Sequence, residues 1–375
     1  MNKVLLDKNK KKILQVLFPG LGGVSSVAFS LVEAERKNKK KYKHIFCFYG
    51  NEKLFKGFKK KCNNLDILNK SFITNINFLS KILVKIKLLK YIFYNKPNVI
   101  ILHNSNVLFY YVLKLFFKCR LIYVHHTPDI SMSIINWIAY IVSNIFSDVT
   151  ILVARKKKSD FIYKLNNFFF KKKVFIIENG INYFRFNNFK KIKKRYSFYC
   201  GMAGRFVEAK KQLLLINIIK NNLEKIKFHR IQMIFAGSGD TEKSLKKYVK
   251  THNLEKYIKF YGNLSEDETI KWFSKLDVYL QISEDETTST SILQAMSMNL
   301  PIIASNIGGN KKLKKKFNQS NNITLVENNE KEILKKIIYL KKNPILRASI
   351  GKSARLGIKK NFNFIKMFNN YEKKF

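Results

Sequence analysis

The segment Asp277–Gly309, DVYLQISEDETTSTSILQAMSMNLPIIASNIGG, holds an apolar run, a helical stretch and a second apolar run in succession. Neither apolar run alternates with polar residues, which is typical of strands buried on both faces. Thr288, Ser289 or Thr290 is suited to cap a helix that continues to Met298. A strand, a helix and a second strand in this order predict neighbouring parallel strands joined by a crossover helix.

The same alternation continues through most of the chain and predicts two doubly wound α/β domains. The polar, basic stretch Ile181–Ser197 interrupts it, so we place the domains at 1–188 and 189–356, followed by an amphipathic helix over 357–375. Two such domains facing each other form a deep cleft, with ligands at the carboxyl ends of the strands. The expected strands are Ile13–Phe18, His44–Tyr49, Asn98–Leu102, Leu121–Val124, Val149–Val153 and Val174–Ile177, and then FYCGMA, IQMIFAG, IKFYG, DVYLQI, PIIA and ITLV.

The charge of the chain is extreme, with a formal net charge of +47 in 375 residues. An excess of this size is typical of proteins that bind nucleic acid or an anionic membrane. However, 63 of the 72 basic residues are Lys and only 9 are Arg, which is the bias of an AT-rich coding sequence. The lysines are dispersed and no nucleic-acid recognition motif occurs, so we expect no nucleic-acid partner, while contact with an anionic surface stays open.

Cysteine use and the N-terminus indicate a cytoplasmic protein. The four cysteines are scattered and form no C-x-x-C, so the sequence indicates neither a zinc site nor a disulfide framework. MNKVLLDKNKKK contains no apolar core of a signal peptide. The most apolar stretch, Ser133–Ala154, is interrupted by Asn136, Asn144 and Asp148, and we interpret it as a buried helix leading into a buried strand.

Two segments carry residues suited to bind a diphosphate and a sugar. GRFVEAKKQLLLI places Arg205 and Lys210 on either side of a short loop, where cations stabilise the charge that develops on a leaving phosphate. Glu286 follows the strand DVYLQI and can accept hydrogen bonds from sugar hydroxyls. The free N–H groups at Ser289 and Thr290 suit a phosphate, although an ordinary capped helix with an exposed Gln294 explains the same stretch.

Weaker indications come from a glycine turn and from the histidines. FPGLGGVSSV ends a strand and begins a helix, and Gly22 and Gly23 allow close approach of a phosphate, but a plain turn explains them equally well. His103, His125 and His126 each follow a strand end, where either a structural or a functional role is open. No carboxylate cluster with metal-ligand spacing is visible.

Taken together, these segments resemble the retaining glycosyltransferases of family four, which have the GT-B fold of two Rossmann-like domains. VFIIENGINYFRF resembles the end of the family's first domain, and GRFVEAKKQ resembles its basic pair. IFAGSGD and IKFYGNLSEDETIKWFSKLDVYLQIS resemble its middle section. ETTSTSILQAMSMNLPIIASNIGG resembles a motif with two glutamates eight positions apart.

The resemblance implies a nucleotide-sugar donor and no metal or other cofactor. It implies that Arg205 and Lys210 hold the diphosphate, that Glu286 lies near the donor sugar and that Gln294 lies near the ribose. It also implies that Gly22 and Gly23 approach the phosphate from the first domain, that His125 lies near the transferred sugar, and that the C-terminal helix crosses back to the first domain. Retention of anomeric configuration would follow from front-face attack.

Four positions depart from the family's pattern. Gln294 replaces the second glutamate, so one acceptor survives without its charge and donor affinity falls by about 1 kcal/mol. Asn299 stands where glycine is usual, in a left-handed cap that Asn tolerates. Asn182 replaces a common aspartate, and Asn310 follows Gly308–Gly309 where a glutamate is usual.

The sequence therefore predicts a hexosyltransferase that acts on a saccharide or lipid-linked acceptor in surface polysaccharide or lipopolysaccharide synthesis. A GT-B protein of altered activity, such as a sugar epimerase or a non-catalytic relative, is the alternative, and a basic nucleic-acid-binding protein is a weaker one. FLSKILVKIKLLKYIF, Phe78–Phe93, is basic and apolar enough to rest on the inner face of an anionic membrane, although an ordinary amphipathic helix explains it too.

Overall fold

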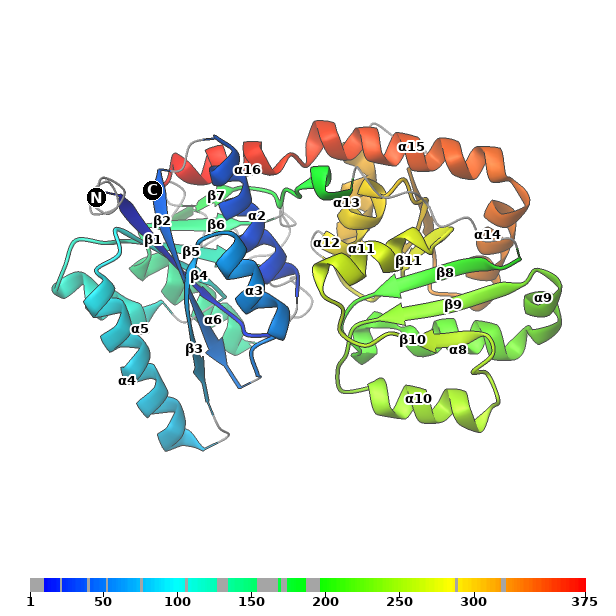
Figure 1. Ribbon diagram of the computed structural model, residues 1–375, viewed down its shortest axis with the longest axis horizontal. Coiled ribbons are helices and arrows are strands. Elements are labelled where there is room, and N and C mark those ends of the chain that lie inside the picture. The colour runs from blue at the N-terminus through cyan, green and yellow to red at the C-terminus, as the bar shows by residue number, and fades with distance from the viewer. Residues whose placement is uncertain are drawn as a thin grey trace. The chain divides into compact units, whose positions relative to one another are not determined.

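The computed structural model divides the chain into two compact units (Figure 1). Unit 1 comprises Met1–Asn182 and Phe364–Phe375, and unit 2 comprises Tyr183–Asn363. The structure describes residues 10–20, 22–38, 41–51, 53–74, 77–104, 107–126, 134–153, 168–169, 174–186, 196–286, 289–317 and 322–375.

Unit 1 is built on a parallel seven-stranded sheet of order β3-β2-β1-β4-β5-β6-β7. The strands are β1 (Lys11–Leu17), β2 (Tyr42–Gly50), β3 (Leu68–Ile73), β4 (Val99–His103), β5 (Arg120–His125), β6 (Val149–Leu152) and β7 (Val174–Ile176). Its helices are α2 (Gly23–Asn38), α3 (Lys56–Asn64), α4 (Phe78–Asn95), α5 (Leu108–Tyr111), η1 (Val112–Leu115), α6 (Ile134–Phe146) and α16 (Phe364–Glu372).

Both faces of this sheet are covered, which explains why its strands are apolar without alternation. Leu14 and Ile100 pack on one face beneath α4, α5 and α6. Ile13 and Ile101 pack on the other face, together with residues of α2 and α16. The last helix supplies Phe364, Met367, Phe368 and Tyr371 to this second core. Residues from the end of the chain therefore complete the core of unit 1.

The sequence missed one strand of unit 1 and correctly separated two other elements. The edge strand β3, LNKSFI, buries only Phe72, so it lacks the apolar run used to recognise the other strands. The apolar stretch Ser133–Ala154 contains α6 followed by the buried strand β6, as predicted. The helix is not buried as expected, because Ile134, Ile138 and Ile145 of α6 are exposed. Within the described residues, no helix is both long and apolar enough to cross a membrane.

Unit 2 contains a parallel six-stranded sheet of order β10-β9-β8-β11-β12-β13. All six of its strands lie where the sequence predicts them: β8 (Phe198–Ala203), β9 (Ile231–Ala236), β10 (Ile258–Phe260), β11 (Val278–Gln281), β12 (Ile302–Ser305) and β13 (Ile323–Val326). The helical segments are η2 (Tyr183–Phe186), η3 (Glu208–Lys210), α8 (Gln212–Asn221), α9 (Leu223–Phe228), α10 (Glu242–Thr251), α11 (Glu266–Ser274), α12 (Thr290–Ser297), α13 (Gly308–Lys316), α14 (Glu330–Lys342) and α15 (Pro344–Asn361).

The strand order in each unit reverses direction once. In unit 2 the chain moves outward from β8 through β9 to β10, and then returns to β11 on the other side of β8. In unit 1 the same reversal lies between β1 and β4. The loops on the two sides of such a reversal diverge, and the crevice left at the carboxyl ends of the strands is where doubly wound sheets bind ligands.

The unit boundaries differ from the expected ones by a few residues. η2 belongs to unit 2 and packs on α12, so the first stretch of unit 1 ends before the expected position 188. The expected C-terminal helix over 357–375 is two helices, because α15 continues to Asn361 and keeps Ile358 fully buried in unit 2. Only α16 and the residues after it return to unit 1.

The helix α15 approaches the end of α12 very closely. Asn299 follows α12 in the left-handed conformation, with φ 57°, as the sequence predicts for a residue in the place of glycine. A Cβ on Gly351 of α15 would lie 2.0 Å from the main-chain oxygen of Asn299. Glycine is therefore required at this crossing for lack of space.

We expect Gly351→Ala to destabilise unit 2, because a backbone oxygen cannot move aside as a side chain can. Overpacking of this kind costs about 2 kcal/mol or more. Chemical denaturation monitored by circular dichroism measures the free energy of unfolding, with the exposed neighbour Lys352→Ala as the control. Equal stability of the two variants would contradict the close crossing.

Candidate functional site

Two loops meet at the carboxyl end of the sheet of unit 2, where β8 and β11 are neighbours. The loop after β8 leads through Arg205 to η3, and the loop after β11 leads to Glu286. The backbone N–H of Glu284 donates to the oxygen of Ala209 at 2.9 Å, and Lys211 forms an ion pair with Glu284. These two contacts join the loops and hold Lys210 beside Glu286.

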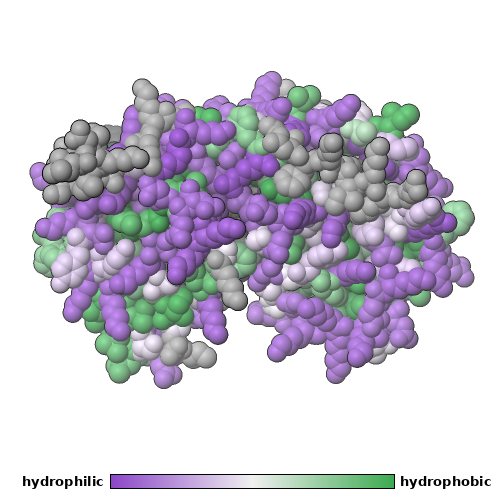
Figure 2. All heavy atoms as spheres, in the orientation of Figure 1, coloured by the Kyte–Doolittle hydropathy of each residue, from purple (hydrophilic) through white to green (hydrophobic). Residues whose placement is uncertain are grey.

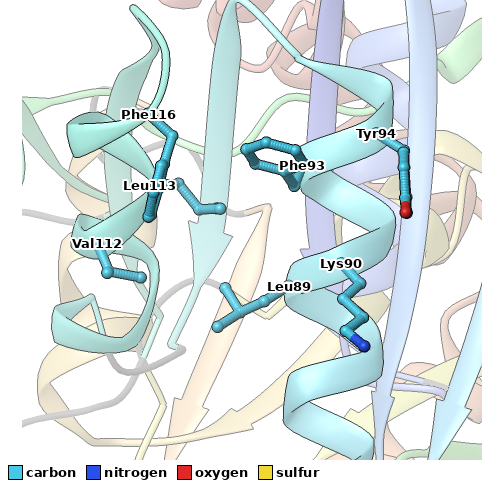
Figure 3. Close-up of a pocket in the computed structure, with 7 residues that line it drawn as sticks. All are labelled: Leu89, Lys90, Phe93, Tyr94, Val112, Leu113 and Phe116. Carbon is cyan, nitrogen blue, oxygen red and sulfur yellow. The ribbon is translucent and has the colours of Figure 1, made fainter.

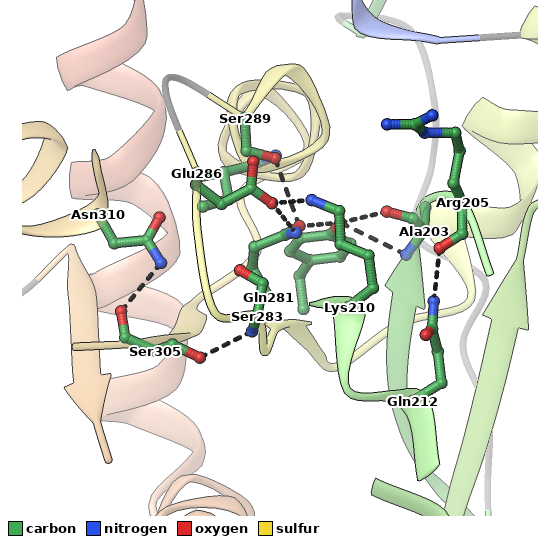
Figure 4. A network of polar contacts seen from close by, with 12 residues as sticks. Ala203, Arg205, Lys210, Gln212, Gln281, Ser283, Glu286, Ser289, Ser305 and Asn310 are labelled. Carbon is green, nitrogen blue, oxygen red and sulfur yellow. Dashed lines mark hydrogen bonds and ion pairs between the residues drawn. The ribbon is translucent and has the colours of Figure 1, made fainter. Parts of the chain in front are cut away.

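The centre of the site is an ion pair between Lys210 and Glu286 (Figure 4). Their side chains are 19% and 11% exposed, respectively. Gln281, the last residue of β11, donates from Nε2 to the same carboxylate oxygen, Oε1, at 2.6 Å. The other oxygen, Oε2, makes no hydrogen bond within the described part of the chain. Glu286 is thus fixed through one oxygen and has the other available as an acceptor.

Gln281 is a site residue that the sequence analysis missed. Its Oε1 accepts a hydrogen bond from the hydroxyl of Tyr279 at 2.8 Å, and this fixes the orientation of the amide. The Tyr279 hydroxyl also lies 3.1 Å from the oxygen of Ala203, at the end of β8. The available indication was a glutamine at the end of the otherwise apolar strand DVYLQI.

Arg205 belongs to the same edge of the sheet but not to the same network. Its main-chain oxygen accepts from Nε2 of Gln212 at 2.8 Å, which fixes the loop after β8. Its side chain is exposed and, in Figure 4, no dashed line joins the guanidinium to Lys210 or Glu286. The pair of cations predicted for a diphosphate therefore consists of one anchored lysine and one arginine free to reorient.

The helix α12 begins as the sequence predicts. Ser289 is the N-cap and its Oγ accepts from the N–H of Ile292 at 3.4 Å, while Thr290 is the first helical residue. Thr288, the other candidate cap, lies outside the described residues. Ser289 also contacts Oε1 of Gln281 at 3.4 Å, so the cap joins the network around Glu286.

Gln294 lies one turn further along α12 and is separate from this network. Its side chain is half-buried and makes no hydrogen bond within the described part of the chain. Its contact with a donor ribose stays a prediction. Another of the four substituted positions, Asn310, is 1% exposed and donates to the main-chain oxygen of Ser305 at 2.9 Å. Asn310 thus stabilises the turn after β12.

The glycines of IFAGSGD allow the loop after β9 to contact the loop after β8. Gly237 has φ 123°, and a Cβ there would lie 2.0 Å from the oxygen of Gly204. Gly239 has φ 156°, and its Cβ would lie 2.5 Å from the oxygen of Phe206. Both positions combine a positive φ with close backbone contact, so this motif supports the loop that carries Arg205.

In unit 1 the glycine turn lies at the corresponding reversal of strand order. Gly22 and Gly23 follow β1 and are exposed, and α2 begins at Gly23. A Cβ on Gly22 would meet no atom within 4 Å. The space beside this glycine is therefore open, which is compatible with the approach of a ligand, and its predicted phosphate contact stays a prediction.

Three polar side chains form a chain of hydrogen bonds at the same edge of unit 1. His103 contacts Oε1 of Gln15 at 3.0 Å through Nε2, and His126 Nε2 at 2.9 Å through Nδ1. Burial lowers the pKa of His103 well below its usual value and lowers that of His126 to about 4, so both rings are neutral. Since the Gln15 oxygen only accepts, His103 donates to Gln15 and accepts from His126.

The structure places His125 differently from its neighbour His126. His125 is 4% exposed, its ring lies 4.9 Å from the ring of Tyr140, and the hydroxyl of Tyr123 is 3.3 Å from its Nδ1. His126 is half-buried, and its backbone N–H donates to Oδ1 of Asn104 at 2.8 Å. The predicted contact of His125 with a transferred sugar stays a prediction, and the geometry adds Gln15, His103 and His126 as residues of this edge.

No metal site is evident in the part of the chain that the structure describes. No three His, Cys, Asp or Glu side chains gather there in a way that would hold a metal ion.

Comparison with known proteins agrees with this geometry. Residues 184–357, which lie within unit 2, match the family model described as glycosyl transferases group 1. The uncharacterized glycosyltransferase MJ1069 of Methanocaldococcus jannaschii is 30% identical over 280 residues, which is 69% of each chain. The capsular polysaccharide biosynthesis glycosyltransferase CapH of Staphylococcus aureus is 29% identical over 180 residues, covering 46% of this chain and 48% of CapH.

The fold has counterparts among solved structures. The structure of Anabaena Alr3699/HepE in complex with UDP and glucose matches with a TM-score of 0.75 and 15% sequence identity, covering 97% of this chain and 99% of that one. Because the MJ1069 relative extends over two thirds of both chains and the family model covers most of unit 2, this chain belongs to the group 1 glycosyltransferases and has the GT-B fold.

Proposed function

We propose that this glycosyltransferase moves a hexose from a nucleoside diphosphate sugar to a saccharide or lipid-linked acceptor, with retention of anomeric configuration. The observation that carries the proposal is the Lys210–Glu286 pair, fixed by Gln281 at the strand-order reversal of unit 2. This edge of a doubly wound sheet is where a nucleotide is expected to bind.

Lys210 and Arg205 are suited to bind the diphosphate of the donor. When the bond to the sugar breaks, the leaving diphosphate gains negative charge, and fixed cations stabilise that charge. The ion pair with Glu286 already orients the Lys210 side chain. Little conformational entropy is therefore lost when the ammonium group donates a hydrogen bond to the phosphate. Arg205 is exposed and can bind two phosphate oxygens at once. The two cations supply the charge that a metal ion would otherwise supply, which supports transfer without a metal.

Glu286 is suited to hold the donor sugar. Its Oε1 is occupied by Lys210 and Gln281, and its accessible Oε2 can accept hydrogen bonds from sugar hydroxyls. A carboxylate in contact with both the phosphate-binding lysine and the sugar aligns the bond that breaks between them. Retention is supported by the resemblance to family four.

The compartment and the pathway are proposed from two further observations. All four cysteines are free, and Cys47, Cys62 and Cys200 are buried, which supports a reducing cytoplasm. A relative is named for capsular polysaccharide biosynthesis and another, WclY of Escherichia coli, for O-antigen biosynthesis. These names support a role in the synthesis of a surface polysaccharide.

The proposal is tested by a donor screen with product analysis. UDP-, GDP- and ADP-hexoses are each incubated with saccharide acceptors, and the products are identified by mass and by the coupling constant of the anomeric proton. We expect one nucleotide series to yield a product with the anomeric configuration of the donor. An inverted product would contradict retention, and conversion of the donor sugar without transfer would indicate an epimerase.

Removing either cation should weaken donor binding. A hydrogen bond to a charged group contributes about 1.5–3 kcal/mol, so Arg205→Ala and Lys210→Ala should each raise the Kd of the nucleotide about tenfold to a hundredfold. Isothermal titration calorimetry with the best nucleotide measures the effect. The control variant Lys225→Ala removes a positive charge from the exposed surface of α9. A similar rise in the nucleotide Kd of this control would contradict a local role of Arg205 and Lys210.

Glu286 and Gln294 should affect different kinetic parameters. Glu286→Ala removes an interaction with the reacting sugar, so we expect kcat to fall by about two orders of magnitude. Gln294→Ala removes at most one neutral hydrogen bond to the ribose, so the donor KM should rise about fivefold while kcat changes little. Initial-rate kinetics over a range of donor concentrations separate the two. An unchanged KM in Gln294→Ala would show that α12 is not beside the ribose.

Gln281 should act as a positioning residue through Glu286. Gln281→Met keeps the size of the side chain but removes the amide that orients the carboxylate, so kcat should fall about tenfold with a smaller change in the nucleotide Kd. Gln281→Glu restores an acceptor for Tyr279 but places a second negative charge beside Glu286, and should be worse than Gln281→Met. If Gln281→Met retains full kcat, the amide does not orient Glu286.

A further inference from the structure

The exposed side of α4 in unit 1 is apolar, which is the reverse of an ordinary surface helix. Leu88 and Ile92 are fully buried against the sheet. On the opposite side, Leu79 is 71% exposed, Leu83 53% and Tyr94 79%. Ile82, Ile86 and Phe93 are also exposed, and the spacing of all six places them in one stripe along the helix.

The neighbouring segment of α5 and η1 extends this surface. Leu115 is 74% exposed and Phe116 is 65% exposed. The ring of Phe116 lies 5.8 Å from that of Phe93, so the two exposed surfaces are continuous. Between them is a groove of about 400 Å³ (Figure 3), lined by Leu89, Lys90, Phe93, Tyr94, Val112, Leu113 and Phe116. Figure 2 shows hydrophobic atoms gathered over this part of unit 1.

The charge around this surface is mainly positive, and the carboxylate of the nearby Asp148 is already paired with Lys114 of η1. From residue 67 to residue 128 the sequence contains nine Lys and Arg residues and no Asp or Glu. Lys87 and Lys90 are exposed on α4 itself, on the same side as Leu83 and Tyr94. Long lysine side chains can lie along an apolar surface while their ammonium groups reach a polar layer. The surface therefore combines apolar side chains with cations at their edge.

A second copy of the chain does not suit this surface. A symmetric dimer would place the same lysines against each other, without a carboxylate from residues 67–128 to neutralise them. An anionic lipid layer has the complementary chemistry, because its hydrocarbon accepts the apolar side chains and its headgroups attract the lysines.

We propose that the α4 face docks on an anionic lipid bilayer. The α4 face is defined as the exposed side chains of Leu79, Ile82, Leu83, Ile86, Lys87, Lys90, Phe93, Tyr94, Leu115 and Phe116. The apolar members enter the boundary between headgroups and acyl chains, and the two lysines contact the headgroups. Unit 1 is thereby held at the membrane surface without crossing it. The inference does not depend on the proposed sugar transfer, since every residue of the α4 face is in unit 1 and the Lys210–Glu286 site is in unit 2.

Vesicle co-sedimentation tests this directly, at about 0.15 M salt, where charges further apart than about 8 Å are screened. The full chain is mixed with vesicles of phosphatidylglycerol and phosphatidylcholine, or with vesicles of phosphatidylcholine alone. We expect binding to the anionic vesicles and little to the neutral ones. Absence of binding, or equal binding to both, would overturn the proposal.

Two variants of the α4 face and two matched controls locate the contact. The triple variant Leu79→Ser, Leu83→Ser, Tyr94→Ser should weaken binding at least tenfold. The control Phe228→Ser, Ile345→Ser, Leu356→Ser removes side chains of similar exposure, 80%, 86% and 65%, from unit 2 and should bind normally. Lys87→Gln with Lys90→Gln should weaken binding about fivefold for each charge removed, whereas Lys352→Gln with Lys359→Gln on α15 should not.

Two further measurements exclude other causes. Circular dichroism, Tm and nucleotide binding should be the same for all variants, since exposed residues are changed and the donor site is in unit 2. If the control variants lose vesicle binding as much as the α4 variants, attraction is due to the total charge and the proposal is wrong. If sedimentation velocity shows a dimer that only the α4 triple variant abolishes, the face binds a second copy and the proposal is likewise wrong.

Discussion

The strand order of unit 2 is the constraint on which the rest of the site depends. Because β11 returns to the side of β8 opposite to β9, the loops after β8 and β11 share one edge of the sheet. Lys210 and Glu286 are 76 positions apart in sequence, yet this topology makes them neighbours. The backbone contact between Glu284 and Ala209 and the tight glycine loop at Gly237 then remove the remaining freedom. The ion pair is a consequence of the order of the strands.

The sequence predicts strands correctly where their burial produces a continuous run of apolar residues. β11 and β12 are buried along their whole length, and they were predicted together with the other four strands of unit 2. β3 was missed because LNKSFI buries only Phe72 and carries polar residues at three of its six positions. Ser289 could be named among three candidates for the cap of α12, since capping depends on local residue types. The end of α15 could not be placed, because contacts distant in sequence decide where that helix stops.

The site was harder to predict than the fold because its geometry depends on side-chain direction. The sequence named Glu286, Lys210 and Ser289 as candidates, and the structure joins them in one network. Gln281, which donates to Glu286, was not named, since a strand residue reveals its partners only once the sheet is assembled. Asn182 shows the same limit. Its Nδ2 donates to the buried Glu33 of the same unit at 2.9 Å. An aspartate at this position would place two carboxylates together, so the amide of Asn182 suits Glu33 as a hydrogen-bond partner where the family's usual residue would not.

Unit 1 is assembled from both ends of the chain, and this has a consequence for synthesis. The side chains of Phe364, Met367, Phe368 and Tyr371 complete a core whose other members all precede Asn182. The ribosome must therefore translate the whole of unit 2 before unit 1 can close over its sheet. Throughout that interval the apolar residues beneath α16 remain uncovered on the nascent chain. Unit 2, whose residues are continuous in sequence, can fold first, and unit 1 is the part that most needs protection from aggregation.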